Sequence, residues 1–311
     1  MTKHNPREEY GKVLLELAKG NHNIFALDAD LCKSTMTCLI EEQLPEQYVE
    51  MGIAEQNMLS VAAGLALTGK IPFVNSFAVF VSGRAFDQIR QAICLSGLNV
   101  KIVGSSAGLS DFGDGSTHQS VEDVSIMRSI PNMTVLVPCD AFQIRAAVKE
   151  MVKYKGPVYM RYSRNELVDL TSETERFEIG KVYKMREGRD ITVFTMGIMV
   201  EKALHVAENL SAKGISVRVV NVPTVKPIDR KAIIELSKDT GRVLTSEEHS
   251  IIGGLGSAVA EALRSERIVI EFHGINDAYG QSSNALQPLF HHYGLDESTM
   301  EKKIIELIKE Q

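Results

Sequence analysis

Short apolar runs alternate with longer amphipathic stretches along most of this sequence, and this alternation constrains the fold most strongly. In the first half, apolar runs at 24–29, 72–76, 100–104, 134–137 and 158–162 predict strands. Helical periodicity fills the intervals, at 6–19, 54–67, 84–96, 121–130 and 141–154. Parallel strands need long crossovers, which helices commonly supply. The first half therefore predicts βαβ units around a largely parallel sheet.

A charged stretch after residue 165 interrupts this pattern, and a second α/β run follows it. In that run we predict strands at 191–195, 217–222, 242–246 and 268–272 and helices at 199–213, 230–238, 256–265 and 297–309. Both units have a normal domain size. The sequence thus predicts an α/β protein of two consecutive, mostly parallel-sheet domains, at 1–168 and 190–311, with a linker at 169–189.

Charge and hydropathy argue against nucleic-acid binding and membrane spanning. The 311 residues include 34 Lys and Arg against 40 Asp and Glu, a net charge of −6 without a block of one sign. Binding to a phosphate backbone needs clustered cations, and a membrane-spanning helix needs about 18 consecutive apolar residues. We therefore expect neither a nucleic-acid nor a membrane partner.

Cysteine is sparse, and the first residues are polar. Cys32, Cys38, Cys94 and Cys139 form no C-x-x-C pair, which predicts reduced thiols rather than a zinc or redox site. The N-terminal MTKHNPREEYGK lacks the apolar core of a signal peptide. These features together predict a cytoplasmic location.

The predicted sheet also indicates where a ligand would bind. In open parallel sheets, ligands lie beyond the carboxyl ends of the strands. We therefore expect a functional rim built from the loops after Ala29, Ser76, Gly104, Val137 and Tyr162. Three segments stand out for their chemistry.

The first segment, GIAEQN at 52–57, places Glu55 at the start of an apolar helix. An acidic residue there complements the helix dipole, which is the purely structural interpretation. Small apolar neighbours also suit a carboxyl that donates a proton near neutral pH. Both interpretations stay open on the residues alone.

The second segment, 75–82, places Phe77 and Phe80 three residues apart at the end of a predicted strand. Most buried aromatic residues simply fill the core. The functional alternative is a flat surface for a planar heterocycle.

The third segment is the long glycine-containing loop 105–119, which includes Asp114 and His118. Loops of this length in compact domains are usually functional or disordered. A lone loop histidine is commonly incidental, but Asp and His four residues apart suit hydrogen bonding to a polyhydroxylated ligand. Histidine also transfers protons readily near neutral pH. A weaker fourth element contains Arg161 and Arg164, which suit either a phosphate or a surface ion pair.

Taken in order, these segments resemble the second and third domains of the transketolase family. The motifs that carry the resemblance are GIAEQ (52–56), the Phe77/Phe80 segment, DGSTHQ (114–119), RSIPNMTVLVPCD (128–140) and RYSR (161–164). The related 1-deoxyxylulose-5-phosphate synthases share this order and a segment like RAFDQ (84–88). The resemblance covers essentially the whole chain and implies a pyrimidine-binding domain followed by the family's C-terminal domain.

The family's first domain, which holds thiamine diphosphate through Mg²⁺, has no counterpart in this sequence. The resemblance therefore implies the C-terminal subunit of a split transketolase, active only with a separate N-terminal subunit and expected as two copies of each. The pyrimidine end of the cofactor would lie on this chain, and the diphosphate and Mg²⁺ on the partner. The implied reaction transfers a two-carbon ketol unit from a ketose phosphate to an aldose phosphate, by default in pentose phosphate metabolism.

The resemblance also implies roles for particular residues. Glu55 resembles the glutamate that hydrogen-bonds N1′ of the aminopyrimidine, and the candidate catalytic residues are Glu55 and His118. Candidate cofactor contacts besides Glu55 are Ile53, Phe77 and Phe80, with Phe80 the stacking partner. Candidate substrate contacts are Asp114 and His118 at the sugar hydroxyls, and Arg7, Ser34 and Arg164 at a phosphate. No residue of this chain is assigned to a metal.

One departure from the family pattern leaves the substrate open. In transketolases a further histidine precedes the DG-x-THQ motif, but here the neighbourhood contains Ser105, Ser106, Asp111 and Phe112. The corresponding arginine of the deoxyxylulose phosphate synthases is also absent. Four alternatives therefore remain: transfer from a branched or unusual ketose phosphate, a deoxyxylulose-phosphate-type carboligation, the beta subunit of a 2-oxoacid dehydrogenase, and a non-catalytic binding subunit.

Overall fold

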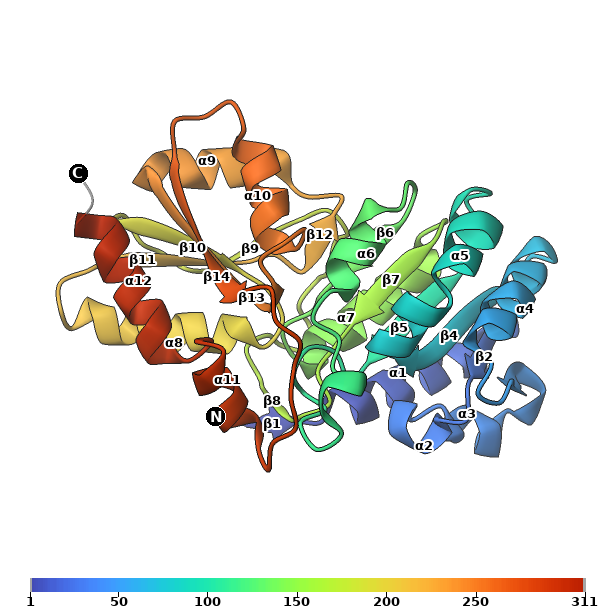
Figure 1. Ribbon diagram of the computed structural model, residues 1–311. Coiled ribbons are helices and arrows are strands. Elements are labelled where there is room, and N and C mark those ends of the chain that lie inside the picture. The colour runs from blue at the N-terminus through green and yellow to red at the C-terminus, as the bar shows by residue number, and fades with distance from the viewer. Residues whose placement is uncertain (1, 310–311) are drawn as a thin grey trace.

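The computed structural model describes residues 2–309 and folds into two α/β domains that lie side by side (Figure 1). The larger sheet has the strand order β12–β6–β7–β5–β4–β2–β3 and is parallel except where β12 meets β6. Its strands are β2 (Ile24–Asp28), β3 (Tyr48–Glu50), β4 (Ile71–Phe77), β5 (Lys101–Ser105), β6 (Thr134–Leu136), β7 (Val158–Arg161) and β12 (Thr224–Lys226). The strands predicted for the first half are all present.

Helices cover both faces of this sheet because strand side chains alternate in direction. From β2, Ile24 and Ala26 share a hydrophobic cluster with α1 and α7, whereas Leu27 shares one with α4. The helices are α1 (Pro6–Gly20), α2 (Cys32–Thr35), α3 (Cys38–Gln43), η1 (Pro45–Gln47), α4 (Glu55–Leu67), η2 (Phe80–Arg84), α5 (Phe86–Gln88), η3 (Ile89–Cys94), η4 (Gly115–Thr117), α6 (Asp123–Ser129) and α7 (Ala141–Lys153). The single helix predicted at 84–96 is divided, because η2 and η3 are π-helical and interrupt the regular α-helical repeat.

The smaller sheet has the order β14–β13–β10–β11–β9 and is parallel except where β9 meets β11. Its strands are β9 (Tyr183–Arg186), β10 (Ile191–Thr195), β11 (Val217–Asn221), β13 (Arg242–Ser250) and β14 (Val269–Ile275). Helices α8, α11 and α12 share one core cluster, and α9 and α10 belong to another. Their bounds are α8 (Met199–Ser211), α9 (Arg230–Thr240), α10 (Leu255–Leu263), α11 (Leu286–His292) and α12 (Glu297–Lys309). The predicted class, two mostly parallel-sheet α/β domains, is confirmed.

The two domains are joined by more than their connecting chain. Strand β12 follows β11 in the sequence but pairs with β6 in the larger sheet. One hydrophobic cluster also continues from Met127 of α6 to Val259 of α10. Strand β9 lies inside the predicted linker 169–189 and pairs with the smaller sheet, while β1 (Lys3–His4) pairs with β8 (Leu167–Val168). The predicted domain boundaries stay predictions.

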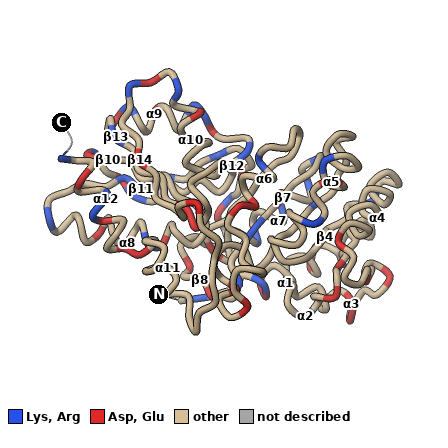
Figure 2. Tube along the Cα trace, viewed as in Figure 1, with Lys and Arg blue, Asp and Glu red and all other residues tan. Residues whose placement is uncertain are grey.

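Charged residues of both signs are interspersed along the trace (Figure 2). This distribution agrees with the small net charge of −6. Within residues 2–309, no helix combines the length and the apolarity that crossing a bilayer requires.

Candidate active site

Glu55 lies at the start of α4, where a tight turn brings it against the end of β4. Gly52 has φ +66°, a left-handed conformation that favours glycine, and its carbonyl accepts from the Ala54 N–H at 2.7 Å. The Glu55 carboxyl is consequently buried, with the residue 4% exposed. The acidic residue at the predicted start of the helix is therefore buried and does not lie on the surface.

Two aromatic rings lie beside this region, at the end of β4 and the start of η2. The Phe77 and Phe80 rings stack with centroids 5.9 Å apart and planes 20° from parallel. The His118 ring meets Phe80 edge-on, with centroids 5.1 Å apart. His118 also contacts Thr117, since its Nδ1 atom lies 2.9 Å from Oγ1 of that residue. The structure thus brings His118 of the long loop to the two phenylalanines.

Arg84 connects the acid to the aromatic pair, a role that the sequence analysis missed. Its Nη1 atom donates to Glu55 Oε1 at 2.9 Å, and its guanidinium carbon lies 4.1 Å from the Phe80 ring centroid. Phe80 and Arg84 are the first and last residues of the π-helical turn η2. The only sequence signal was the RAFDQ segment, to which no role was attached.

The predicted phosphate contacts meet around a cavity of about 420 Å³, which residues 110–114 of the long loop help to line. Arg7, Asp114 and Arg164 line this cavity. Ser34 adjoins it, because Arg7 Nη1 donates to the Ser34 carbonyl oxygen at 3.5 Å. Burial and the neighbouring Arg164 guanidinium lower the pKa of Arg7. The cavity therefore has two arginines that an anion could neutralise.

A buried carboxylate already contacts one of these arginines. Asp111 is 2% exposed and accepts from Arg164 Nη1 at 2.7 Å, whereas the more exposed Asp114 lies 3.9 Å from the same nitrogen. Burial raises the pKa of Asp111, the Arg164 charge opposes that rise, and the adjacent Asp114 carboxyl adds to it. The sequence analysis noted Asp111 only as a departure from the family pattern.

The apolar residues of loop 105–119 belong to the core of the second domain. Leu109, and Val121 just beyond the loop, share a hydrophobic cluster with residues of α8 and α12, and Phe112 packs against that cluster. Both Leu109 and Val121 are nearly inaccessible to solvent. A loop that belongs by sequence to the first domain therefore depends on the second for its burial.

Residues 280–283, which we call the strap, also hold this loop from the second domain. The Ser283 N–H donates to the Phe112 carbonyl oxygen at 2.8 Å. Gln119 Nε2 donates to the Gln281 carbonyl oxygen at 3.1 Å. The strap therefore fixes the loop at two points on either side of Asp114.

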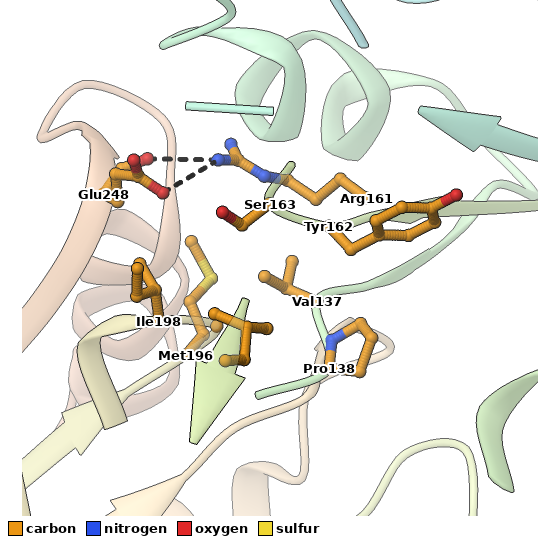
Figure 3. A pocket seen from close by; sticks show the side chains of 10 residues that line it. Val137, Pro138, Arg161, Tyr162, Ser163, Met196, Ile198 and Glu248 are labelled. Carbon is orange, nitrogen blue, oxygen red and sulfur yellow. Dashed lines mark hydrogen bonds and ion pairs between the residues drawn. The ribbon is translucent and has the colours of Figure 1, made fainter. Parts of the chain in front are cut away.

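Arg161 does not face the cavity with Arg164 but lies buried between the domains. Its Nη1 atom donates to Asp123 Oδ1 at 2.6 Å, and its Nη2 atom donates to the Glu248 carbonyl oxygen at 3.2 Å. Glu248 in turn accepts from the Leu109 N–H at 2.9 Å, and burial raises the pKa of Glu248 to about 7. Figure 3 shows Arg161 and Glu248 beside a small cavity of about 20 Å³. The residues that line this cavity include Val137, Tyr162, Met196 and Ile198.

The predicted residues therefore fall into two groups joined by the long loop. Glu55, Phe77, Phe80 and His118 form what we call the aromatic face, to which Arg84 belongs as well. Arg7, Ser34, Asp114 and Arg164 surround the cavity. Ile53 is 74% exposed on the turn before α4. Their roles toward ligands stay predictions.

Comparison with known families identifies both halves of the chain. The family model for the transketolase pyrimidine-binding domain matches residues 3–168, and that for the transketolase C-terminal domain matches residues 180–300. The chain belongs to the transketolase family. The expected resemblance is thereby confirmed over most of the sequence.

Individual transketolase relatives match along nearly the full chain. A 6-deoxy-6-sulfo-D-fructose transketolase subunit from a Clostridium species is 45% identical over 90% of this chain and 88% of its own length. A subunit of the apulose-4-phosphate transketolase from Phocaeicola vulgatus is 37% identical over 97% of both chains. A solved structure described as a split gene transketolase, inactive beta4 tetramer, is 45% identical, covers 99% of both chains and has a TM-score of 0.90.

Proposed function

We propose that this chain is the C-terminal subunit of a heteromeric, thiamine-diphosphate-dependent transketolase that transfers a two-carbon ketol unit from a ketose phosphate to an aldose phosphate. The observation that carries the proposal is the aromatic face, where Arg84 joins buried Glu55 to the stacked phenylalanines next to His118. Two relatives named as transketolase subunits, and a split gene transketolase of the same fold, support it.

The aromatic face fits the pyrimidine end of thiamine diphosphate. A flat, half-buried ring next to a buried carboxyl suits a planar heterocycle that both stacks and accepts a proton. Bound there, the cofactor supplies the electron sink for carbon–carbon bond cleavage. We assign Glu55 to hold a proton at N1′, Phe80 to stack, and Phe77 and Ile53 to support the ring.

The diphosphate end and Mg²⁺ are assigned to the N-terminal partner subunit. Over residues 2–309, His, Cys, Asp and Glu side chains form no cluster suited to a metal ion. The cofactor would thus lie between chains, with two copies of each subunit in a heterotetramer. We place this assembly in the cytoplasm, where free thiols such as those of the four cysteines stay reduced.

The cavity is assigned to the sugar. Asp114 and His118 lie on one loop and would hydrogen-bond the sugar hydroxyls, with His118 also placed to transfer a proton. Arg7, Arg164 and Ser34 would hold a terminal phosphate, which suits paired guanidinium groups. The two relatives are named for different sugars, so we propose the reaction class and keep both a pentose phosphate role and a specialised ketose as substrates to test.

The deciding experiment is two-carbon transfer from xylulose 5-phosphate to ribose 5-phosphate with Mg²⁺ and thiamine diphosphate. We expect activity only when this chain is mixed with its N-terminal subunit. Activity of this chain alone would contradict the shared site. If a mixture assembles and binds cofactor but uses pyruvate as donor instead, the reaction is a carboligation or an oxoacid decarboxylation and the transketolase assignment fails.

A further inference from the structure

The pairing of Asp111 with Arg164 bears on which sugars the cavity accepts. Arg164 faces the cavity with 39% of its side chain exposed, yet one of its nitrogens is already engaged by the buried Asp111 at 2.7 Å. The second carboxylate oxygen of Asp111, Oδ2, is buried and finds no hydrogen-bond partner in the part of the chain that the structure describes. A substrate in the cavity therefore meets an arginine that already has an internal competitor, and this carboxylate has not used its full capacity to accept hydrogen bonds.

The acidic residues around the cavity weaken its attraction for a dianion. The lining includes two arginines, Arg7 and Arg164, against three acids, Asp111, Asp114 and Glu166, which is a formal charge of −1. Charges at hydrogen-bond distance in a partly buried site interact far more strongly than in bulk water. A terminal phosphate on Arg164 would thus be repelled by Asp111, whereas a neutral hydroxyl would not be repelled.

We propose that Asp111 is a specificity-determining residue: it competes with the terminal group of the substrate for Arg164, so that the cavity disfavours a dianionic phosphate relative to a monoanionic or hydroxyl-bearing end. The inference rests on the proposed function in one respect: it takes the terminal group to be that of the sugar substrates. The competition itself is a property of this chain, because Asp111 and Arg164 both belong to it and contact each other directly.

The same competition makes anion binding depend on pH. Burial and the Asp114 carboxyl raise the pKa of Asp111, and the Arg164 charge opposes this; Arg7 faces the same group. A protonated Asp111 no longer repels an anion. Anion affinity should therefore rise as pH falls and Asp111 takes up a proton.

The test is binding of sulfate to the full-length chain by calorimetry, at constant ionic strength, in a pH series from mildly alkaline buffer down to the ordinary carboxyl range. Sulfate is a tetrahedral dianion whose charge does not change over that range. Asp111→Asn is compared with Glu166→Gln, which removes the same charge from the same cavity. Glu166 is exposed, and no ion pair between it and Arg164 occurs among residues 2–309.

We expect Asp111→Asn to bind sulfate about tenfold more tightly in alkaline buffer and to lose the pH dependence of the wild type. Glu166→Gln should change affinity less than threefold and keep that dependence. Equal effects of the two variants would mean that only the net charge of the cavity determines sulfate affinity, and this would overturn the proposal. Weaker binding to Asp111→Asn would mean that Asp111 orients Arg164, which also overturns it.

The wild-type pH series needs no variant, so it remains decisive even if Asp111→Asn folds poorly. A flat series contradicts competition by Asp111. In the complex reconstituted with the N-terminal subunit, Asp111→Asn should lower KM for a ketose phosphate and leave kcat unchanged. If the wild-type complex transfers no two-carbon unit, the proposed function fails by itself, and the sulfate result still decides the role of Asp111.

Discussion

Two arginine–carboxylate pairs at the candidate site share a composition but differ in surroundings. In Glu55–Arg84 the acid is 5% exposed and the arginine 49%, and in Asp111–Arg164 the values are 2% and 39%. In the first pair Arg84 lies over the Phe80 ring, whereas the second pair shares its cavity with the further cation Arg7. In the first pair the acid is therefore the group with a proposed chemical role, and in the second it is the arginine. The neighbours, not the pair, decide which partner a ligand would use.

The two regions also differ in what holds them in place. Glu55, Phe80 and Arg84 come from two elements of the first domain, α4 and η2, which only β4 separates in the sequence. Asp111 lies on a loop that is fixed by the strap 280–283 and by Glu248 of the second domain. We therefore expect changes in the second domain to disturb the cavity and to spare the aromatic face.

Glu55→Gln is expected to have the largest effect and to distinguish the roles of the two pairs most clearly. An amide at this position keeps its shape and still hydrogen-bonds Arg84, but it does not exchange a proton. Turnover of the reconstituted complex should fall by a factor on the order of a hundred or more, the usual contribution of a general acid or base. Steady-state kinetics at saturating cofactor measures this loss, and thermal unfolding checks that the subunits still assemble.

The comparison predicts that Glu55→Gln lowers kcat, whereas Asp111→Asn changes KM alone. Wild-type turnover in Glu55→Gln with cofactor saturated would remove Glu55 from the mechanism. The two pairs would then have no functional difference.

Glu248→Gln tests whether the second domain holds the loop through a protonated acid. Burial raises the pKa of Glu248 from 4.5 to about 7. The folded state thus binds the proton more tightly than the unfolded chain, so this stabilisation is complete below about pH 4.5 and is lost as pH rises through about 7. The free energy of unfolding of the wild type should fall by on the order of 3 kcal/mol more than that of Glu248→Gln across this range.

Urea unfolding at a series of pH values measures that difference. Glu235→Gln, on the exposed side of α9, is the matched control and should follow the wild type. Parallel curves for the wild type and Glu248→Gln would mean that Glu248 stays ionised against Arg161 throughout. The loop would then be held by an ion pair instead.

Local patterns predicted the aromatic face well, because its residues lie in short segments with their own structural signals. The strand ending at Phe77 and the helix starting at Glu55 follow from apolar runs, and Gly52 allows the turn that precedes the helix. The contact of Arg84 with both Glu55 and Phe80 depends on the π-helical turn. That turn departs from the regular periodicity on which a sequence prediction relies.

The cavity was predicted less completely, because contacts distant in sequence build it. The insertion of Leu109 into the second core and the pairing of β12 with the first sheet join residues that no local pattern connects. Asp111 was visible as an unusual residue, but its contact with Arg164 spans 53 positions. Only the fold brings the two together, so the charge of the cavity could not be derived from the sequence.

Gly280→Ala tests the strap itself. The backbone at Gly280 suits alanine, but an added Cβ would lie 1.8 Å from Gln119 Oε1 and 2.8 Å from its Cδ. The Gln119 side chain would have to leave its bond to the strap. Overpacking of this kind costs about 1–3 kcal/mol, and we expect the free energy of unfolding to fall by that amount. In the complex, KM for the sugar should rise while cofactor affinity stays unchanged.

Asn284→Ala is the control for Gly280→Ala, since Asn284 is exposed just beyond the strap. This variant should change neither the free energy of unfolding nor KM. Calorimetric cofactor binding separates the two regions directly. A loss of cofactor affinity in Gly280→Ala as large as the rise in KM would show that the strap supports both, and the contrast between the regions would not hold.

The smallest effect is expected from Arg84→Ala. Removing one partner of an ion pair usually weakens a site, but here we expect it to strengthen cofactor binding. Arg84 engages Glu55 and covers the Phe80 ring, the two groups proposed to contact the aminopyrimidine. An exposed salt bridge contributes up to about 1 kcal/mol, and a cation–π contact at an exposed site about 0.5–1 kcal/mol. Removing this competitor should tighten thiamine diphosphate binding to the complex about fivefold, measured by calorimetry.

Arg90→Ala provides the matched control, because it removes an exposed arginine from the adjacent η3 and leaves Glu55 untouched. It should leave cofactor affinity at the wild-type value. Weaker cofactor binding in Arg84→Ala would instead mean that Arg84 holds the Glu55 carboxyl in position. Each pair would then contain one functional and one supporting partner, and the competition proposed for Asp111 would be peculiar to the cavity.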